Sequence, residues 1–267
     1  MNKFVKILLI ISIIVGIVGI GFLGYGYYLK LTRKVNNPLA TIEVENYGTI
    51  KVELYPDMAP NTVTNFIRLA NRNFYDGKDF HRTIPNFMIQ GGSNGEEKGN
   101  PVLANIKDNA SEKEYAIEGE FIANGFNKNI LKLKKGVIAM ARADYSNLSP
   151  ALTKNGYDSA GSQFFIMQED NENLNGLYAG FGKVIEGLDV VDKIANVEVK
   201  SREEGAEGQD EPVNKPVIKS IRVETFGVDY GEPKTMEPFD YYKWMMSQYP
   251  MQQQEELTEE LIEKQKE

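Results

Sequence analysis

The chain contains no cysteine and only one histidine, His81, among its 267 residues. Without cysteine there can be no disulfide, no thiol nucleophile and no zinc site built from thiolates. A metal site that needs two or more histidine ligands is excluded, and a Ser-His-Asp triad could be built only on His81. The chain also has no motif for a metal bound by oxygen ligands, so we expect neither a metal nor a cofactor.

Clustered positive charge is lacking as well. The formal net charge is −8, from 30 Lys and Arg against 38 Asp and Glu. Surfaces that bind phosphate backbones gather Lys and Arg, so we expect no nucleic-acid partner. Hydrophobic residues make up 42% of the chain and charged residues 25%, the balance of a globular protein that buries a core.

One long uncharged run lies near the N-terminus. Residues 7–29 carry no charge and follow Lys3 and Lys6. As a helix, this run is about 35 Å long, enough to cross a hydrocarbon core of about 30 Å. No A-x-A cleavage site is found, so we predict an uncleaved transmembrane anchor over a cleaved signal peptide and a secreted form. The anchor separates an N-terminal tail, 1–6, from a linker, 30–38.

The orientation of this anchor depends on a weaker argument. Lysines and arginines flank both sides in similar numbers, so the positive-inside rule decides little. A short tail followed by one large domain is the usual layout of an exported, tethered protein. We therefore expect a single-pass cell-membrane protein with a cytoplasmic tail and the rest of the chain outside the cytoplasm.

Short strands dominate the remaining pattern. Residues 40–45 and 49–54 alternate between apolar and polar around a turn at 46–48, which predicts a β-hairpin. Further strand-like runs lie at 87–90, 137–141, 163–167, 181–185 and 217–225.

Two helices are expected among these strands. Val63, Phe66, Ile67 and Ala70 have the i, i+3, i+4, i+7 spacing of one helical stripe. A second helix is predicted over 188–195. Many short strands with only two helices favour an all-β sandwich or barrel over an alternating α/β sheet.

Polar segments interrupt this pattern. The stretches 93–135 and 142–161 are long and irregular, and loops beyond about 12–15 residues are usually functional or disordered. The acidic segment 201–209 has the composition of a solvated loop. The tail, 227–267, holds the single tryptophan and ends in polar helix formers, so we expect a partly helical, solvated extension.

Four motifs follow one another along the chain. The first is FHRTIPNFMIQGG at 80–92, which sets His and Arg beside Phe and Met. GVIAMA at 136–141, GSQFFI at 161–166 and FGKV at 181–184 come next. In this order the motifs resemble those of the cyclophilin family of peptidyl-prolyl cis-trans isomerases, and the resemblance covers about residues 40–226.

The resemblance implies both a fold and an activity. The fold is an eight-stranded antiparallel closed β-barrel capped by two α-helices, here over residues 39–226, with a proline-binding groove on its outer face. The activity is rotation about X-Pro bonds of proline-containing polypeptides, without a covalent intermediate. Outside the cytoplasm, this activity would assist the folding of exported proteins.

The resemblance also implies roles for individual residues. The catalytic set comprises Arg82, Gln90 and His81. The residues that match substrate-binding positions are Phe87, Met88, Ala141, Arg142, Gln163, Phe165, Leu174 and Tyr178. Taken alone, His81 is more often a structural histidine than a catalyst. Arg82 could be a surface ion-pair partner, but its apolar neighbours favour the catalytic role.

Two positions depart from the better-known members of the family. Asn173 stands where they carry tryptophan, and Tyr178 stands where many carry histidine. Losing the indole removes a large apolar face and an N–H donor, so we expect cyclosporin to bind weakly. The alternative function is a non-catalytic proline-peptide-binding, chaperone or assembly module on the same barrel. A hydrolase built on His81 lacks a G-x-S-x-G serine motif.

Overall fold

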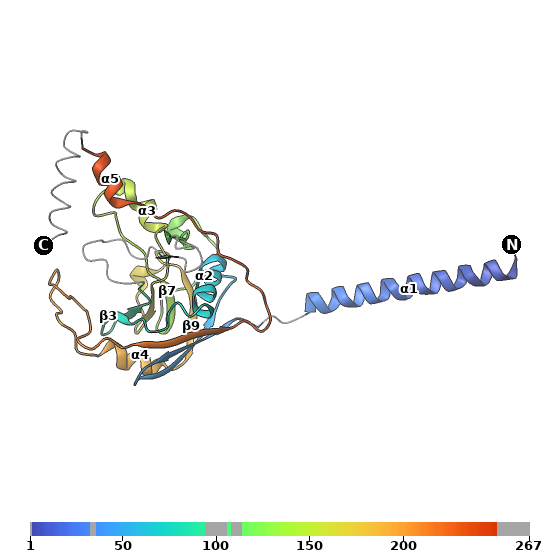
Figure 1. Ribbon diagram of the computed structural model, residues 1–267, viewed down its shortest axis with the longest axis horizontal. Coiled ribbons are helices and arrows are strands. Elements are labelled where there is room, and N and C mark those ends of the chain that lie inside the picture. Colours follow the sequence, from blue (N-terminus) through green and yellow to red (C-terminus); the bar gives the residue numbers. More distant parts are fainter. Residues whose placement is uncertain (1, 33–35, 94–105, 108–113, 250–267) are drawn as a thin grey trace. The chain divides into compact units, whose positions relative to one another are not determined.

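The computed structural model describes residues 2–32, 36–93, 106–107 and 114–249. The chain forms two compact units, Met1–Asn36 and Asn37–Glu267. The first contains one helix, α1 (Lys3–Thr32) (Figure 1). Across the described ranges, no helix is both long enough and apolar enough to cross a membrane. The membrane span predicted within this helix is not confirmed and stays a prediction.

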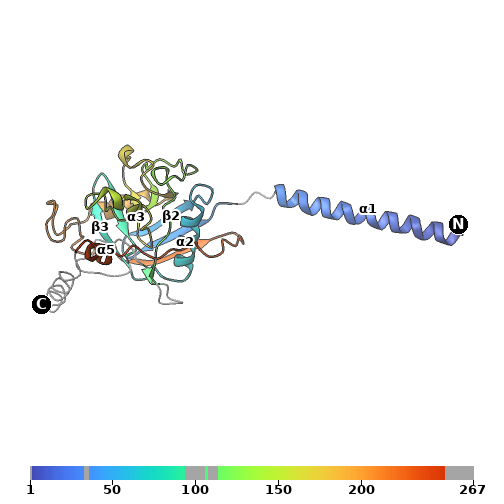
Figure 2. The same ribbon diagram turned by 90° about the horizontal axis from the view of Figure 1, so that it is seen from above.

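The second unit is built on one curved antiparallel sheet of eight strands, seen from two directions in Figures 1 and 2. Their order is β10-β1-β2-β9-β7-β8-β4-β3. The strands are β1 (Leu39–Val44), β2 (Gly48–Leu54), β3 (Phe80–Ile84), β4 (Met88–Gly91), β7 (Val137–Met140), β8 (Phe164–Met167), β9 (Gly180–Glu186) and β10 (Ile218–Glu224). All except β3 match predicted runs. The pattern of β3 is interrupted by His81 and Arg82, which are polar neighbours in an otherwise apolar segment.

The two outer strands of the sheet, β10 and β3, meet only over a short stretch. Asp79 forms an isolated antiparallel bridge with Val217. Beside it, the Phe80 amide donates to the Pro216 carbonyl at 2.9 Å, and the Ile218 amide donates to Lys78 at 2.7 Å. The predicted closed barrel is therefore not confirmed as a continuous ladder, although the antiparallel eight-stranded sheet is.

The hairpin between β1 and β2 forms as predicted. Val44 pairs with Gly48 across the turn, and Asn46 and Gly48 both have positive φ, 63° and 123°. Asparagine and glycine are the residues that adopt this conformation most readily. The predicted inward residues of the hairpin are all buried: Ala40, Ile42, Val44, Ile50, Val52 and Leu54.

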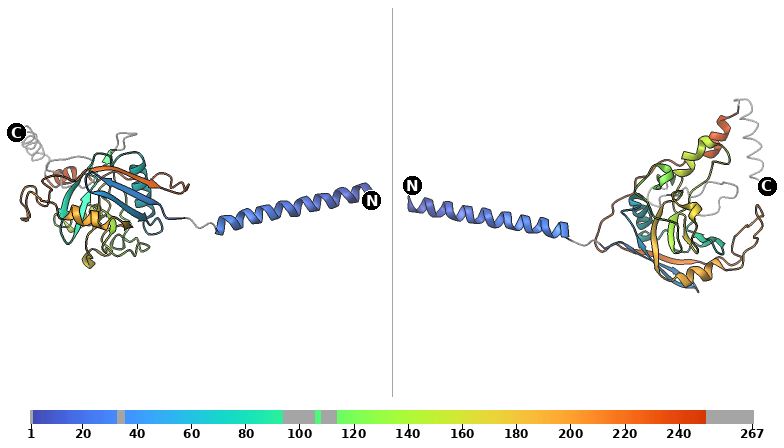
Figure 3. Two further views of the ribbon diagram at one scale, coloured as in Figure 1. Left: turned by 90° about the horizontal axis from the view of Figure 1, so that it is seen from below. Right: turned by 180° about the vertical axis from the view of Figure 1, so that it is seen from behind.

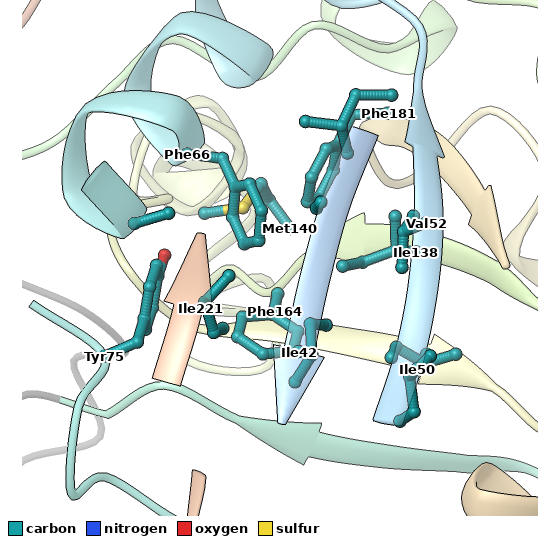
Figure 4. Close-up of a cluster of buried hydrophobic side chains, with 14 of the residues drawn as sticks. Ile42, Ile50, Val52, Phe66, Tyr75, Ile138, Met140, Phe164, Phe181 and Ile221 are labelled. Atoms are coloured by element: carbon teal, nitrogen blue, oxygen red, sulfur yellow. The ribbon is translucent and has the colours of Figure 1, made fainter. Parts of the chain in front are cut away.

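Both predicted helices cover the core. In α2 (Pro60–Asn71), proline occupies the first turn, where its missing N–H costs no hydrogen bond. The predicted stripe of α2 is buried, and Phe66 contacts Phe164 and Phe181, with ring centroids 5.7 and 5.1 Å away (Figure 4). The second helix, α4 (Leu188–Ala195), buries Val190, Val191 and Ile194. It contacts β2, β3 and β4, and it lies in front of the strands in the left view of Figure 3.

Short elements lie in the connections between the strands and in the C-terminal extension. These are β5 (Ile106–Lys107), β6 (Glu114–Tyr115), η1 (Ile122–Asn124), η2 (Pro150–Leu152), α3 (Thr153–Tyr157), η3 (Glu172–Leu174) and α5 (Tyr241–Ser247). The predicted loop 142–161 thus contains η2 and α3, and β5 pairs with β6.

The described part of the C-terminal extension contacts the domain at several points, while its residues stay exposed or partly buried, and α5 gives it the expected helix. Lys234 and Asn61 exchange two hydrogen bonds of 2.7 and 2.9 Å, and Met236 and Ala116 exchange two backbone hydrogen bonds. Farther on, Trp244 packs against a small cluster in the loop 142–161. These partners lie far away in sequence, which is why composition could not reveal them. The helix formers at 252–267 lie outside the described residues.

Candidate functional site

The sheet separates two apolar clusters on its opposite faces. Successive residues of a strand point to opposite faces, and in β8 Phe164 and Ile166 join the main core while Phe165 and Met167 join a second cluster. β7 and β4 alternate in the same way. The buried members of the second cluster are Met88, Leu133, Val137, Ala139, Ala141, Phe165 and Met167. Partly buried residues pack against them, namely Ile84, Phe87, Leu131, Leu174 and Tyr178.

This second cluster brings together the residues predicted to hold proline. Met88, Phe165 and Ala141 are 2–5% exposed, while Phe87 and Leu174 are partly buried at its edge. The predicted set comes from β4, β8, η3 and the end of β7, so only the fold could unite it. An apolar surface of this kind suits a proline ring.

Strand register connects the predicted arginine to this cluster. Arg82 pairs with Gln90, Gln90 pairs with Phe165, and Phe165 pairs with Ala139. Directly opposed residues on neighbouring strands share a face of the sheet. Arg82 and Gln90 therefore stand in one row with Phe165, at the polar end of the apolar cluster.

A β-bulge places His81 beside this row. The register between β3 and β4 shifts between Phe80 and Arg82, which leaves His81 as the additional residue. Burial lowers the pKa of His81 below its ordinary value, and the nearby charge of Asp79 opposes this shift. The imidazole is therefore neutral near pH 7. Its Nδ1 is buried without a hydrogen-bond partner.

The two predicted glutamines form a buried polar pair. Gln90 Nε2 donates to Gln163 Oε1 at 2.9 Å, and both residues are only 6–7% exposed. This bond fixes the two side chains relative to each other and to the row of Arg82. Gln163 also hydrogen bonds His81, which ties the bulge to the same pair.

The guanidinium of Arg142 is engaged in contacts within the domain. It donates to the Leu177 carbonyl at 3.0 Å and to the Ala143 carbonyl at 2.9 Å. It also lies over the rings of Phe121, Tyr157 and Tyr178, at 5.6, 4.8 and 4.6 Å. The side chain thus joins three loops, and only the backbone of this residue is left to pair with a peptide.

Tyr178 and Asn173 form the far rim of the cluster. The Tyr178 ring stands perpendicular to Phe165, with centroids 5.3 Å apart. Asn173 lies in η3 next to Leu174 and is exposed. At this position the chain therefore has no large apolar side chain beside Leu174.

Two residues near Arg82 were missed in the sequence. Asp210 approaches Arg82, with 3.6 Å between Oδ2 and Nη2, and Arg202 contacts the other oxygen of Asp210 at 3.1 Å. Both lie in or beside the segment 201–209, whose acidic composition predicted a solvated loop. No local pattern signals that this loop returns to β3.

Comparison with known proteins identifies a family for this chain. The model for cyclophilin type peptidyl-prolyl cis-trans isomerase/CLD matches residues 39–223. A peptidyl-prolyl cis-trans isomerase of Acinetobacter baylyi is 42% identical over 67% of this chain and 81% of its own length. Peptidyl-prolyl cis-trans isomerase B of Bacillus subtilis is 38% identical over 58% of this chain and 90% of its own.

A solved structure shows the same likeness. The crystal structure of a Cryptosporidium parvum cyclophilin type isomerase, determined in the presence of the dipeptide Ala-Pro, has a TM-score of 0.52 and 26% identity. The match covers 70% of this chain and 98% of that one. The chain belongs to the cyclophilin-type peptidyl-prolyl cis-trans isomerase family. Its activity is the cis-trans isomerisation of peptidyl-prolyl bonds.

Proposed function

We propose that isomerisation takes place on the second apolar cluster, with the proline ring against Phe87, Met88 and Phe165. The X-Pro amide would rotate beside Arg82. The observation that carries this proposal is the row of Arg82, Gln90 and Phe165 across three adjacent strands. It sets a cationic donor beside the apolar cluster.

The chemistry requires little more than this arrangement. A peptide bond resists rotation by about 18–20 kcal/mol because its C–N bond has partial double-bond character. The two isomers of an X-Pro bond differ by only about 0.5–1 kcal/mol, so both occur and exchange slowly. No nucleophile is needed, because no covalent bond is broken.

Arg82 would lower this barrier by differential binding. As the amide twists, its nitrogen loses conjugation and its lone pair becomes a hydrogen-bond acceptor. A guanidinium N–H binds that lone pair in the transition state more strongly than in the planar ground state, which is the condition for catalysis. The apolar surface excludes water and so strengthens this contact.

The remaining predicted residues would hold the peptide. Gln90 and Gln163 present amide groups to the substrate backbone, and the segment at Ala141 and Arg142 pairs with it through main-chain groups. His81 and Tyr178 form the rim. Since the buried His81 is neutral, its role in this proposal is to shape the site and not to transfer a proton.

The physiological substrates would be proline-containing chains that fold outside the cytoplasm. Residues 7–29 support this proposal, because their uncharged length suits a membrane anchor for the catalytic domain. Proline isomerisation takes about 10–100 s without a catalyst, which makes it a slow step for an emerging chain. Asn173 supports the related proposal that cyclosporin binds weakly.

The test is an isomerisation assay on residues 36–267, with wild type beside Arg82→Ala. We expect the wild type to accelerate exchange in X-Pro peptides and Arg82→Ala to lose about 10²–10³-fold of that rate, the usual cost of one preorganised donor to a transition state. A folded wild-type domain without activity, over a range of residues before proline, would point to the non-catalytic binding module instead. An Arg82→Ala variant with full activity would contradict the proposed role of this residue.

A further inference from the structure

A buried carboxylate lies behind the proposed catalytic arginine. The side chain of Asp210 is only 6% exposed, whereas that of Arg82 is 42% exposed. The two are 3.6 Å apart, from Asp210 Oδ2 to Arg82 Nη2. This exceeds the ordinary hydrogen-bond range of about 2.7–3.2 Å. The carboxylate therefore attracts the guanidinium by charge, and the guanidinium N–H groups remain available as donors.

Asp210 is itself held firmly. Its amide donates to the Ser201 carbonyl at 2.8 Å, and its carbonyl accepts from the Thr83 amide at 2.9 Å. Thr83 is the next residue after Arg82 in β3. The main chain of the carboxylate is therefore attached to the strand that carries the arginine, so the relative position of the two groups is determined by backbone bonds.

Arg202 completes the arrangement. Its Nη1 contacts the second oxygen of Asp210 at 3.1 Å and also donates to the Thr83 carbonyl. If Arg82 were the only partner of this carboxylate, the pair would have no net charge, whereas catalysis needs a positive one. Because Asp210 lies between two guanidiniums, the three groups keep a net positive charge, and Arg82 remains cationic toward a substrate.

We propose that Asp210, shared with Arg202, is a positioning residue that holds the Arg82 guanidinium in the orientation required by the twisted amide. This inference rests on the proposed role of Arg82. A long, partly exposed arginine has many rotamers, and a guanidinium has five N–H donors in a fixed fork. A charge fixed near Nη2 restricts the rotamers, while the other donors remain directed away from the carboxylate.

The decisive variant is Asp210→Asn, which removes the charge and keeps the shape. Asparagine also tolerates the positive φ of this position, 58°. The matched control is Asp189→Asn, which removes the exposed partner of Lys193 on α4 and changes the net charge by the same amount. Both are made in the full chain, solubilised in mild detergent, and thermal unfolding is recorded for each.

We expect Asp210→Asn to lower kcat by about five- to tenfold with the peptide Kd unchanged, because the lost interaction acts in the transition state. In an Arg82→Ala background, the same substitution should change the residual rate by less than about twofold. A substitution that merely disturbed the fold would weaken peptide binding and lower the rate equally in both backgrounds. Asp189→Asn should leave all of these values unchanged.

Several results would overturn the inference. In the first, the wild type is active and depends on Arg82, but Asp210→Asn leaves kcat unchanged or raises it. Asp210 then does not position the arginine, and the proposed function stands. Equal losses in the presence and absence of Arg82 would also reject a role through this side chain. If wild type itself is inactive, or indifferent to Arg82, the proposed function falls and the inference falls with it.

Discussion

At the residue scale, the site depends on which side chains are free to meet a substrate and which are already engaged. Arg82 is partly exposed at the edge of an apolar cluster. Arg142 was predicted at the same site, but its guanidinium is buried among carbonyls and aromatic rings. The Arg142 guanidinium thus binds three loops together, while Arg82 is the arginine that we propose faces the substrate.

The small side chain of Asn173 leads to a prediction about cyclosporin. We expect the wild-type domain to bind it with a Kd above 1 μM, that is, less favourably than about −8.2 kcal/mol. Asn173→Trp should strengthen binding by about tenfold or more, since an indole adds a large apolar face and a donor. Titration calorimetry measures both values.

Glu172→Trp is the control for this prediction, because Glu172 is an exposed neighbour in the same short helix, η3. It should leave the affinity at the wild-type level. Sub-micromolar binding by the wild-type protein would contradict the prediction, as would equal gains from both tryptophans.

At the scale of elements, the C-terminal extension packs against the loop 142–161 through residues 239–244, which we call the strap. Phe239 and Trp244 pack against Tyr145 and Leu152, and the Tyr145 and Phe239 rings lie 5.3 Å apart. Burial raises the pKa of Tyr145 to about 12, as expected for a phenol enclosed by this cluster. The loop begins at Arg142, one of the predicted site residues, so the strap packs against a segment next to the proposed site.

Removing the largest ring of the strap should destabilise the loop 142–161. We expect Trp244→Ala to lower the free energy of unfolding by about 1–3 kcal/mol, less than for a fully buried tryptophan. Each kcal/mol corresponds to about 2–4 °C in Tm for a domain of this size. Thermal unfolding by circular dichroism gives the shift, and hydrogen exchange should increase in the loop 142–161.

Lys243→Ala provides the comparison on the same helix, since Lys243 is exposed and its backbone, not its side chain, receives the cap from Asp240. Its Tm should stay within about 1–2 °C of the wild-type value, as for most surface changes. Equal behaviour of the two variants would mean that the tail lies on the domain without stabilising it.

At the scale of the whole molecule, the chain combines a 30-residue N-terminal helix with one catalytic domain. We propose that the helix holds this domain at a membrane. The full chain expressed in a bacterial host should then remain with the membranes after alkaline extraction, whereas residues 36–267 should be soluble and equally active per molecule. Protease treatment of intact cells, after removal of the outer layers, should reach the domain.

A charged variant separates a membrane anchor from a helix that merely associates with other proteins. Ile14→Lys with Val18→Lys keeps a helix former at both positions and places two charges near the helix centre, each costing about 2.5–3.5 kcal/mol in a bilayer. This variant should leave the membrane fraction. A full chain that is extracted as readily as the variant would contradict membrane anchoring.

Features that depend on near neighbours in the chain could be predicted from the sequence. Alternation predicted β1 and β2, strand-like apolar runs predicted five more of the eight strands of the main sheet, and helical spacing predicted α2 and α4, because a period of two or 3.6 residues directly reports which face is buried. The order of the motifs was enough to indicate the family, and with it the pocket residues at Met88, Phe165 and Leu174.

Contacts between distant segments follow from the fold and could not be predicted from local sequence. The register of β3, β4 and β8 places Arg82 in a row with Gln90 and Phe165, and the path of a polar loop returns Asp210 to that arginine. The cage around Arg142 and the strap at Trp244 arise in the same way. Such contacts join residues tens of positions apart, and local periodicity carries no information about their partners.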